Sequence, residues 1–508
     1  MTNRVILCLE TPPVLHEELL ASSVRRLGDF IHALSNKPEL DILCNVSAAS
    51  QAERLATAIN EKIGPVNVRS YSGPIAIALH GCISADEVAV VFPGIVPFLD
   101  VRQGMQMLER HLKFRTHYSY SDTAVPGFLF DIVSGDLFTD MPPEGMQQPT
   151  IEALRAFCFR NIQDVDIDLH YATPDLRAYR LRLDCLDARS ADRALRVYRK
   201  YPDLVHEQLS DVVRSEADLC GRQPSYLEIE LTTEQAVQPT VYPTTEKHSL
   251  DEEQASLILK SLRAFRLEND VTVCLGGRGD PFAYAGLDDF VAALSAIDVV
   301  KALYIETPGV GLTRSRLDSL VAAWNLSERS GGSQRSPSLM TLIVRLPSLK
   351  QAQYRRWMGV DRLNDVLSFL DSICANPVAI NVCAEMIRLP ENEEELDGFM
   401  KRFPADKVRP LIGKYSRFGD ALPALDVVDL SPLNRDYCRH LAFDFFINAK
   451  GEMPVCRQKL SGGPTLRESD LLSVFESRRN LHLSWMKGEY ESVLPQCASC
   501  DDWYFFNA

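Results

Sequence analysis

Residues 271–281 read Val-Thr-Val-Cys-Leu-Gly-Gly-Arg-Gly-Asp-Pro, an apolar run that passes directly into a glycine-rich turn. Valine and leucine predict a buried strand, and the glycines predict a loop in which the backbone can approach a neighbour closely. Asp280 closes the loop, where a carboxylate can pair with an ammonium group or begin a helix. This strand and loop decide the fold because similar units flank them.

The alternation of strand and helix continues on both sides of residues 271–281. Residues 226–232, 300–307, 339–347 and 378–387 also predict buried strands. Ser249 with Glu252 predicts a capping box before the first helix of this region, and Thr313 predicts the N-cap of the third. We expect parallel βα units, as an open sheet or a full or partial barrel, with sites at the carboxyl ends of the strands. The Ser/Gly-rich residues 327–338 predict a surface loop.

Residues 1–220 predict a separate α/β domain. Helical periodicity at residues 16–34 and 50–63 alternates with apolar segments that predict strands at residues 41–47, 67–72 and 88–94. The length of 508 residues also requires several domains.

Composition excludes several classes of protein. The net charge of −15 comes without a Lys/Arg stripe, which argues against a nucleic-acid partner. No window reaches the roughly 18 apolar residues of a membrane span. Acidic residues come too early at the N-terminus for a secretion signal, so we expect a cytoplasmic protein.

The last seventy or so residues contain a cysteine cluster. Cys438 and Cys456 flank an aromatic run with a predicted hairpin turn at Lys450-Gly451, and Cys497 and Cys500 form a C-x-x-C. Four soft ligands suit Cys₄ zinc or a [4Fe–4S] cluster; four unpaired thiols or a redox-active C-x-x-C are the alternatives. The other nine cysteines are scattered, as expected of small buried hydrophobic residues.

The pattern C-x₁₂-G-x₄-C followed by C-x-x-C resembles the SPASM domain, the C-terminal iron–sulfur extension of many radical SAM enzymes that modify peptides and proteins. The chain has four of the seven cysteines of a full SPASM domain. The resemblance therefore implies one auxiliary [4Fe–4S] cluster bound by Cys438, Cys456, Cys497 and Cys500, with zinc less favoured.

The resemblance also implies a radical SAM-like partial barrel upstream. In that family the first strand leads into C-x-x-x-C-x-x-C, whose thiolates hold a cluster that chelates S-adenosylmethionine. Here those positions are Gln235, Pro239 and Tyr242. None of the three can replace a thiolate, because proline has no donor, the amide is a poor iron ligand and the phenol is normally protonated.

Other radical SAM signatures remain. Residues 276–281 are similar to the family's G-x-G-[D/E]-P loop, which makes Gly277, Gly279 and Asp280 a vestigial S-adenosylmethionine loop. We expect little binding of S-adenosylmethionine without the cluster. The likeness spans residues 225–508 and is closest to the spiro-SPASM group, with a radical SAM-like barrel at 225–428 and a SPASM domain at 429–508.

In the spiro-SPASM group the N-terminal domain resembles nucleotidyltransferases and GT-A-type sugar transferases. Residues 90–100 look like a segment that usually reads G-D-x-P-F-L-D, but Ile95 stands in place of the metal-binding aspartate. Asp100 remains and is expected to be a helix N-cap. The glycine-rich phosphate loop is also missing, so the domain resembles a degenerate transferase.

The favoured function is an iron–sulfur protein that has lost radical SAM cleavage. It would act as a binding, scaffold or electron-transfer component with a peptide or protein substrate or a redox partner. One alternative is an active radical SAM enzyme with unusual cluster ligation. A second is a nucleotidyl or glycosyl transferase with accessory C-terminal domains. No catalytic residue is assigned.

Overall fold

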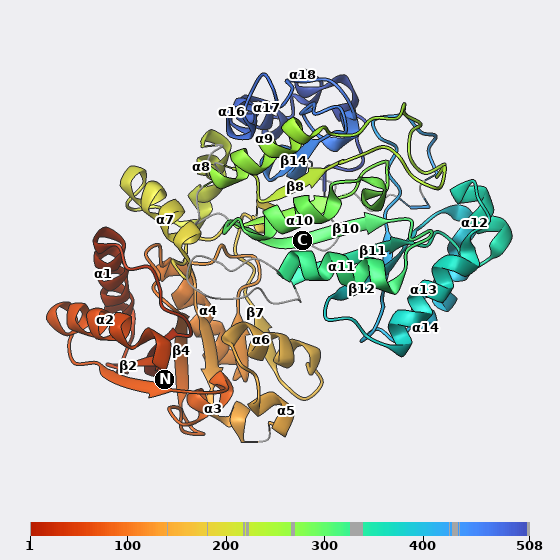
Figure 1. Ribbon diagram of the computed structural model, residues 1–508. Helices are drawn as coiled ribbons and strands as arrows, with labels where there is room; N and C mark the ends of the chain where they lie inside the picture. The colour runs from red at the N-terminus through yellow and green to blue at the C-terminus, as the bar shows by residue number, and fades with distance from the viewer. Residues whose placement is uncertain are drawn as a thin grey trace. The chain divides into compact units, whose positions relative to one another are not determined.

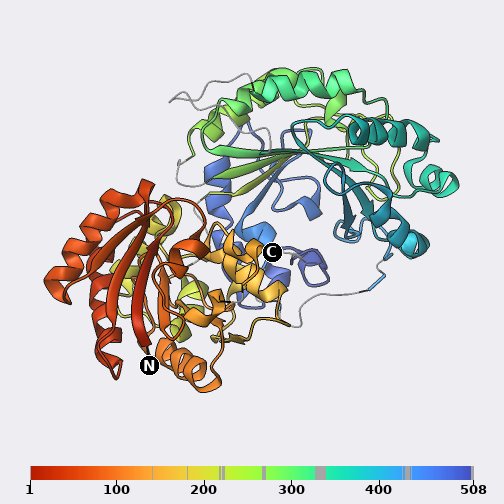
Figure 2. The ribbon, with the colours of Figure 1, turned by 90° about the horizontal axis from the view of Figure 1, so that it is seen from below.

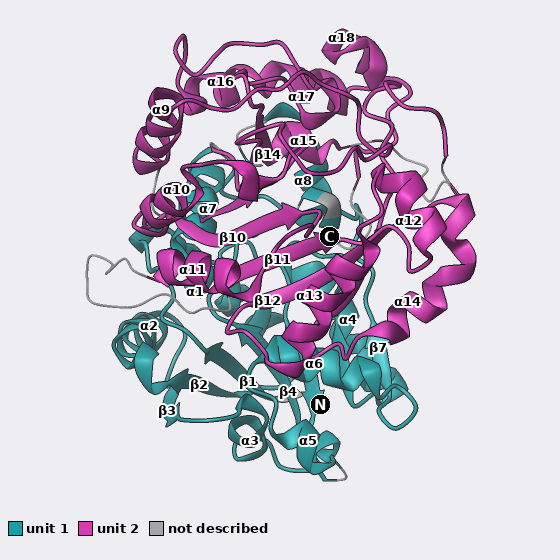
Figure 3. Cartoon of the chain, turned by 45° about the vertical axis from the view of Figure 1, so that its right-hand side comes forward, with its two compact units in different colours: residues 1–219 teal, residues 220–508 magenta. Residues whose placement is uncertain are grey.

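The computed structural model describes residues 2–504, except 140, 180, 217–218, 220–222, 266–269, 326–338, 426, 429–434 and 436 (Figure 1). The expected loop at residues 327–338 lies outside the described residues. The chain forms two compact units, residues 1–219 and 220–508 (Figure 3). Within the described part of the chain, no helix is both long and apolar enough to span a membrane.

Unit 1 contains a mixed seven-stranded sheet in the order β3-β2-β1-β4-β6-β5-β7. Its strands are β1 Thr2–Leu9, β2 Glu39–Asn45, β3 Asn67–Tyr71, β4 Val88–Pro93, β5 Tyr118–Tyr120, β6 Asp131–Ser134 and β7 Ile167–Leu169. Only β6 runs antiparallel to its neighbours, β4 and β5. The helices are α1 Glu17–Ala33, α2 Ala49–Lys62, α3 Ile75–His80, α4 Val101–Phe114, α5 Pro143–Met146, α6 Ile151–Arg160, α7 Ala188–Lys200 and α8 Leu209–Ser215. The strands and helices predicted in this region are confirmed.

Unit 2 contains a parallel seven-stranded sheet in the order β13-β12-β11-β10-β9-β8-β14. Its strands are β8 Tyr226–Ile229, β9 Val271–Leu275, β10 Val300–Thr307, β11 Met340–Arg345, β12 Asn381–Ile387, β13 Arg409–Gly413 and β14 Asp444–Ile447. The five predicted strands and their parallel pairing are confirmed, and β13 and β14 extend the sheet at its two edges.

Helices follow the strands of unit 2 and then continue into the cysteine-containing segment. They are α9 Glu252–Arg263, α10 Leu287–Ser295, α11 Arg314–Asn325, α12 Gln351–Met358, α13 Leu363–Ala375, α14 Leu396–Arg402, α15 Arg439–Ala442, α16 Leu471–Ser477, α17 Arg479–Met486 and α18 Tyr490–Val493. Figure 2 shows the helices of residues 250–375, green to teal, along one face of the sheet.

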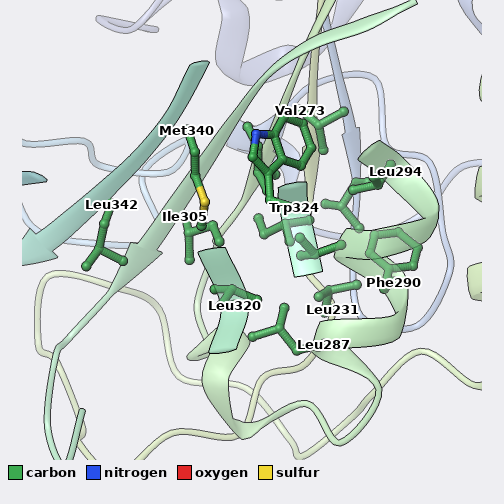
Figure 4. Packing of buried hydrophobic residues seen from close by; sticks show 14 of the residues in the cluster. Leu231, Val273, Leu287, Phe290, Leu294, Ile305, Leu320, Trp324, Met340 and Leu342 are labelled. Carbon is green, nitrogen blue, oxygen red and sulfur yellow. The ribbon is translucent and has the colours of Figure 1, made fainter. Parts of the chain in front are cut away.

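The core of unit 2 lies between this sheet and its helices. Trp324 of α11 is fully buried and lies between Val273 of β9 and Met340 of β11 (Figure 4). Alternate strand residues point into this apolar layer, so their neighbours face the other side of the sheet. That second face is the one available for polar side chains.

Two expectations of local structure need correction. The capping box of α9 is formed by Asp251 and Gln254 instead of Ser249 and Glu252, because the helix begins at Glu252. The turn at Lys450-Gly451 is present, since the Gly451 N–H donates to the Asn448 carbonyl (2.8 Å), but no second strand returns along β14. β14 pairs with β8 instead, so the predicted hairpin is wrong.

Candidate metal centre

Three short segments supply the four cysteines. Cys438 directly precedes α15, Cys456 follows the turn after β14, and Cys497 and Cys500 come after α18. Cys438 and Cys497 are buried in one apolar cluster, together with Leu441, Trp485, Val493 and Trp503. The fold therefore brings the first cysteine next to the C-x-x-C, 59 positions later in the chain.

The thiols are close enough to influence one another. Burial raises the pKa of Cys438 well above its ordinary value, and the charges of Cys456, Cys500 and Cys497 raise it further. Burial also raises the pKa of Cys497 to about 11 and that of Cys500 to about 12, with Cys456 adding to both. Metal binding at such a set would displace thiol protons.

The four cysteine sulfurs lie in one region of the fold, but they are not arranged as the ligands of one metal ion. Over the described ranges, no three His, Cys, Asp or Glu side chains are arranged to hold a metal ion. The assignment of Cys438, Cys456, Cys497 and Cys500 as ligands therefore stays a prediction, and the choice between an iron–sulfur cluster and zinc stays open.

Arg435 organises the C-x-x-C loop. Its guanidinium donates hydrogen bonds to the carbonyl oxygens of Cys497 (2.7 Å), Ala498 (2.6 Å) and Cys500 (3.1 Å). It also lies over the rings of Trp485, Tyr490 and Trp503. Arg435 thus fixes the loop through its carbonyl oxygens. These hydrogen bonds do not involve the sulfurs of Cys497 and Cys500.

His440 connects the two cysteine-bearing regions. Its Nδ1 lies 2.9 Å from Asp444 and its Nε2 lies 3.4 Å from Asp502. Despite burial, hydrogen bonds to these two carboxylates raise the pKa of His440 to about 10. Because Asp502 follows Cys500 by two residues, this ion pair ties the C-terminal loop to the segment after Cys438.

Two buried donors without partners lie in the segment that contains the cysteines. Within the described residues, Nη1 of Arg478 and Nε1 of Trp485 have no hydrogen-bond partner. Buried polar groups are normally satisfied, so unsatisfied groups call for an explanation. A sulfur-ligated centre would offer anionic acceptors, and hydrogen bonds to sulfur tune such centres. The donor set therefore fits the metal centre that the cysteines suggest.

The predicted S-adenosylmethionine loop lies at the carboxyl end of β9. Gly277 has φ +98°, and a Cβ on Gly279 would lie 2.0 Å from the Thr232 carbonyl oxygen. Asp280 is 6% exposed and accepts hydrogen bonds from the Phe282 N–H (3.1 Å) and the Thr307 hydroxyl (3.0 Å). The structure thus brings the three predicted residues together and engages the carboxylate within the protein.

The loop of residues 235–242 is held by packing. Tyr242 contacts Phe418, with ring centroids 5.6 Å apart, and burial raises the pKa of Tyr242 to about 12. The N–H groups of Gln238 and Thr240 donate to the carbonyls of Met358 (2.8 Å) and Trp357 (2.9 Å) at the end of α12. The phenol is therefore protonated at neutral pH and cannot serve as an anionic ligand.

A charged face of the sheet was missed from the sequence. Glu228 of β8, Glu306 of β10, Arg345 of β11 and Glu385 of β12 share it, and Arg345 and Glu385 are direct register partners. Arg345 donates to Glu306 (2.7 Å) and to the Gly277 carbonyl (2.9 Å). A period-two pattern of charges in apolar strands was the available signal.

One arginine among these four side chains does not neutralise the three glutamates. Burial raises the pKa of both Glu228 and Glu385 to about 7; Arg457 opposes the first shift, whereas Glu306 adds to the second. Arg457, directly after Cys456, lies 3.3 Å from Glu228. The charged face of the sheet and the cysteine segment are therefore in direct contact.

In unit 1 the residue predicted to replace a metal-binding aspartate is part of the core. Ile95 is fully buried, and the Asp100 carboxylate accepts from the Gln103 N–H (3.1 Å) at the start of α4. Asp100 is therefore the N-cap expected from the sequence, as is Thr313 for α11, where its hydroxyl accepts from the Arg316 N–H (3.2 Å).

Comparison with known proteins gives distant likenesses. No protein-family model matches the chain. An uncharacterized protein of Treponema pallidum (strain Nichols) is 24% identical over 364 residues, covering 68% of this chain and 96% of its own length.

Two solved structures are also similar in part. Streptococcus suis SuiB bound to precursor peptide SuiA has a TM-score of 0.41 and 14% identity, covering 65% of this chain and 79% of that one. BtrN in complex with AdoMet and 2-DOIA has a TM-score of 0.35 and 16% identity, covering 54% and 92%. With TM-scores this low, any functional argument must come from the residues of the chain itself.

Proposed function

We propose that this chain is a radical SAM/SPASM-type protein of the spiro-SPASM kind that binds one auxiliary [4Fe–4S] cluster through Cys438, Cys456, Cys497 and Cys500. It has lost S-adenosylmethionine cleavage. It acts as a binding, scaffold or electron-transfer component towards a peptide or protein substrate or a redox partner.

The gathering of four thiols from three segments carries the proposal. Cys438 and Cys497 share one apolar cluster, and the charges of Cys456, Cys500 and Cys497 act on Cys438. When bound, a cluster would supply one-electron transfer at this place. The residues of the chain supply its ligands, its dry surroundings and its hydrogen-bond donors.

Loss of cleavage is inferred from the strand-end loop. Gln235, Pro239 and Tyr242 provide no thiolate, and the loop that contains them is packed on α12. The buried Cys274 of β9 lies beside Glu306 (3.7 Å), and a single thiol cannot replace a three-thiolate ligand set. The vestigial loop at Gly277, Gly279 and Asp280 retains its shape through internal contacts.

For unit 1 we propose a degenerate nucleotidyltransferase-like role in binding or structure. The mixed sheet with a parallel β3-β2-β1-β4 core supports this reading, and the buried Ile95 supports the loss of metal binding. We retain the division of unit 2 into a barrel at 225–428 and a SPASM domain at 429–508 as part of the proposal.

Iron and acid-labile sulfide analysis of anaerobically purified protein tests the proposal. One cluster, with about four irons per chain, and no 5′-deoxyadenosine from S-adenosylmethionine under dithionite are expected. Two clusters or 5′-deoxyadenosine would establish the alternative of an active enzyme with unusual ligation. Zinc in place of iron would remove the electron-transfer role, and Mg²⁺-dependent nucleotide turnover would favour the transferase alternative.

A further inference from the structure

Arg478 is a buried cation without a carboxylate partner. It lies between α16 and α17 with 3% of its surface exposed. Its Nη2 donates to the Pro454 carbonyl (2.6 Å), and its Cζ lies 4.3 Å from the ring centroid of Phe445. No carboxylate in the described part of the chain forms an ion pair with it, and Nη1 has no hydrogen-bond partner there.

The surroundings of Arg478 do not explain its charge. A buried ion without a counter-charge is strongly destabilising, and the usual solution is a paired carboxylate. Other arginines near the cysteines are differently placed. Arg457 pairs with Glu228, and the partly exposed Arg435 is used on the C-x-x-C carbonyls.

Arg478 is linked to the cysteine site through the main chain. It donates to the carbonyl of Pro454, two residues before Cys456; burial lowers the pKa of Arg478, and the charge of Cys456 opposes this shift. Four thiolates around one divalent metal ion leave a net charge of about −2, and a [4Fe–4S] centre with four thiolates is anionic as well. A metal-loaded site would therefore supply the counter-charge that the chain lacks.

We infer that Arg478 is the internal counter-cation of the four-cysteine site, acting on it as a positioning residue. It compensates for the negative charge of the loaded centre, supplies an unpaired Nη1 donor and fixes the Cys456 segment through Pro454. This inference rests on the proposed function, because it requires that the cysteines bind a metal.

The inference predicts opposite effects in the two states of the protein. Without metal, Arg478 is an unpaired buried charge, so its replacement by an apolar side chain of similar length relieves a penalty. With metal, the same replacement removes a neighbour of the site, and such neighbours are worth about 10- to 100-fold in metal affinity. A residue that only braces the Pro454 carbonyl would lose stability in both states.

The test compares Arg478→Met with Arg479→Met in the full-length chain stripped of metal. Arg479 is the next residue, pairs with Glu476 at the surface and serves as the matched control. Co²⁺ is the probe, because its thiolate complexes absorb in the visible and near-ultraviolet. Binding is followed by absorbance under competition with a chelator, and the metal-free proteins are compared by thermal unfolding.

Arg478→Met is expected to weaken Co²⁺ binding by about 10-fold or more and to raise the unfolding temperature of the metal-free chain. Arg478→Lys, which keeps the charge, should recover part of the affinity, and Arg479→Met should match the wild type. Unchanged Co²⁺ affinity together with a less stable metal-free protein would overturn the inference and leave the proposed function intact. Failure of the wild type itself to bind Co²⁺ would overturn the inference, and the iron and sulfide analysis decides the proposed function separately.

Discussion

The guanidinium of Arg345 lies over the ring of Tyr242, with its Cζ 4.5 Å from the ring centroid. Tyr242 occupies the third cluster-ligand position of the radical SAM pattern, and Arg345 ends β11 at the charged face of the sheet. A cation–π contact therefore occupies a position where the resemblance would place iron chemistry. The loop is stabilised by packing and has no ligand set.

This contact predicts a large structural role for Tyr242. Tyr242→Ala should lower the free energy of unfolding by about 3 kcal/mol, because it removes a buried aromatic ring and uncovers a buried guanidinium. Urea unfolding followed by circular dichroism measures the change. Tyr171→Ala, at a residue 66% exposed, should change stability by less than about 0.5 kcal/mol. Equal effects at the two positions would refute the packing role.

The cysteine assignment predicts a paired loss of metal. Cys497→Ser/Cys500→Ser should abolish iron binding and the visible absorbance, because two of the four soft ligands are removed. Elemental analysis of anaerobically prepared protein measures it. Cys374→Ser is the control, because Cys374 is a partly buried cysteine of α13 that is not among the four predicted ligands. If iron and colour survive in the double variant, the ligand assignment is wrong.

Packing around the loop after β9 predicts that Gly279 tolerates no side chain. A Cβ there would lie 2.0 Å from the Thr232 carbonyl oxygen and 2.8 Å from the Thr233 Cα, so backbone must shift. Gly279→Ala should destabilise unit 2 by about 2 kcal/mol or more. At Gly398 in α14 nothing lies within 4 Å, and Gly398→Ala should be neutral or stabilising by up to about 1 kcal/mol. Thermal or urea unfolding distinguishes the two variants.

The charged face predicts a pH dependence of stability. Burial, and next the charge of Glu306, raise the pKa of Glu385 from 4.5 to about 7, whereas Arg345 and Arg457 oppose the shift. The folded chain therefore binds this proton more tightly than the unfolded chain. The contribution is fully present below pH 4.5 and is lost as the pH rises through 7.

Glu385→Gln should therefore flatten the fall in unfolding free energy between pH 5 and pH 8 by about 2.5 kcal/mol at most. One pKa unit is worth about 1.4 kcal/mol, and part of the rise from 4.5 to about 7 acts below pH 5. Urea unfolding at a series of pH values measures the slope. Glu394 is exposed and lies beyond the end of β12. Glu394→Gln should therefore keep the pH slope of the wild type. A variant of Glu385 with an unchanged slope would contradict the assigned environment.

The order of strands and helices was within reach of the sequence. Period-two and helical patterns are local, and the parallel βα units of residues 226–387 appear where those patterns predict them. The N-caps at Asp100 and Thr313 were also predicted, because a cap depends on a few consecutive residues. The capping box predicted at Ser249 and Glu252 lies two residues too early. The Ser249 hydroxyl hydrogen-bonds to Thr232, a contact outside the helix, and Asp251 is the N-cap of α9.

Residue identity also determined what the chain lacks. Gln235, Pro239 and Tyr242 rule out a three-thiolate site at their positions in any fold, because ligand chemistry does not depend on packing. In the same way, Ile95 excludes an aspartate-bound metal at its position. The four C-terminal cysteines were recognisable as a candidate site from their spacing alone.

Only the tertiary structure decided which residues meet. β14 joins the sheet beside β8, more than two hundred residues earlier, and this pairing brings Arg457 to Glu228. The buried, unpaired state of Arg478 and the stacking of Arg345 on Tyr242 arise from such long-range contacts. Local patterns do not specify them, because burial and electrostatic environment depend on all the elements that pack around a side chain.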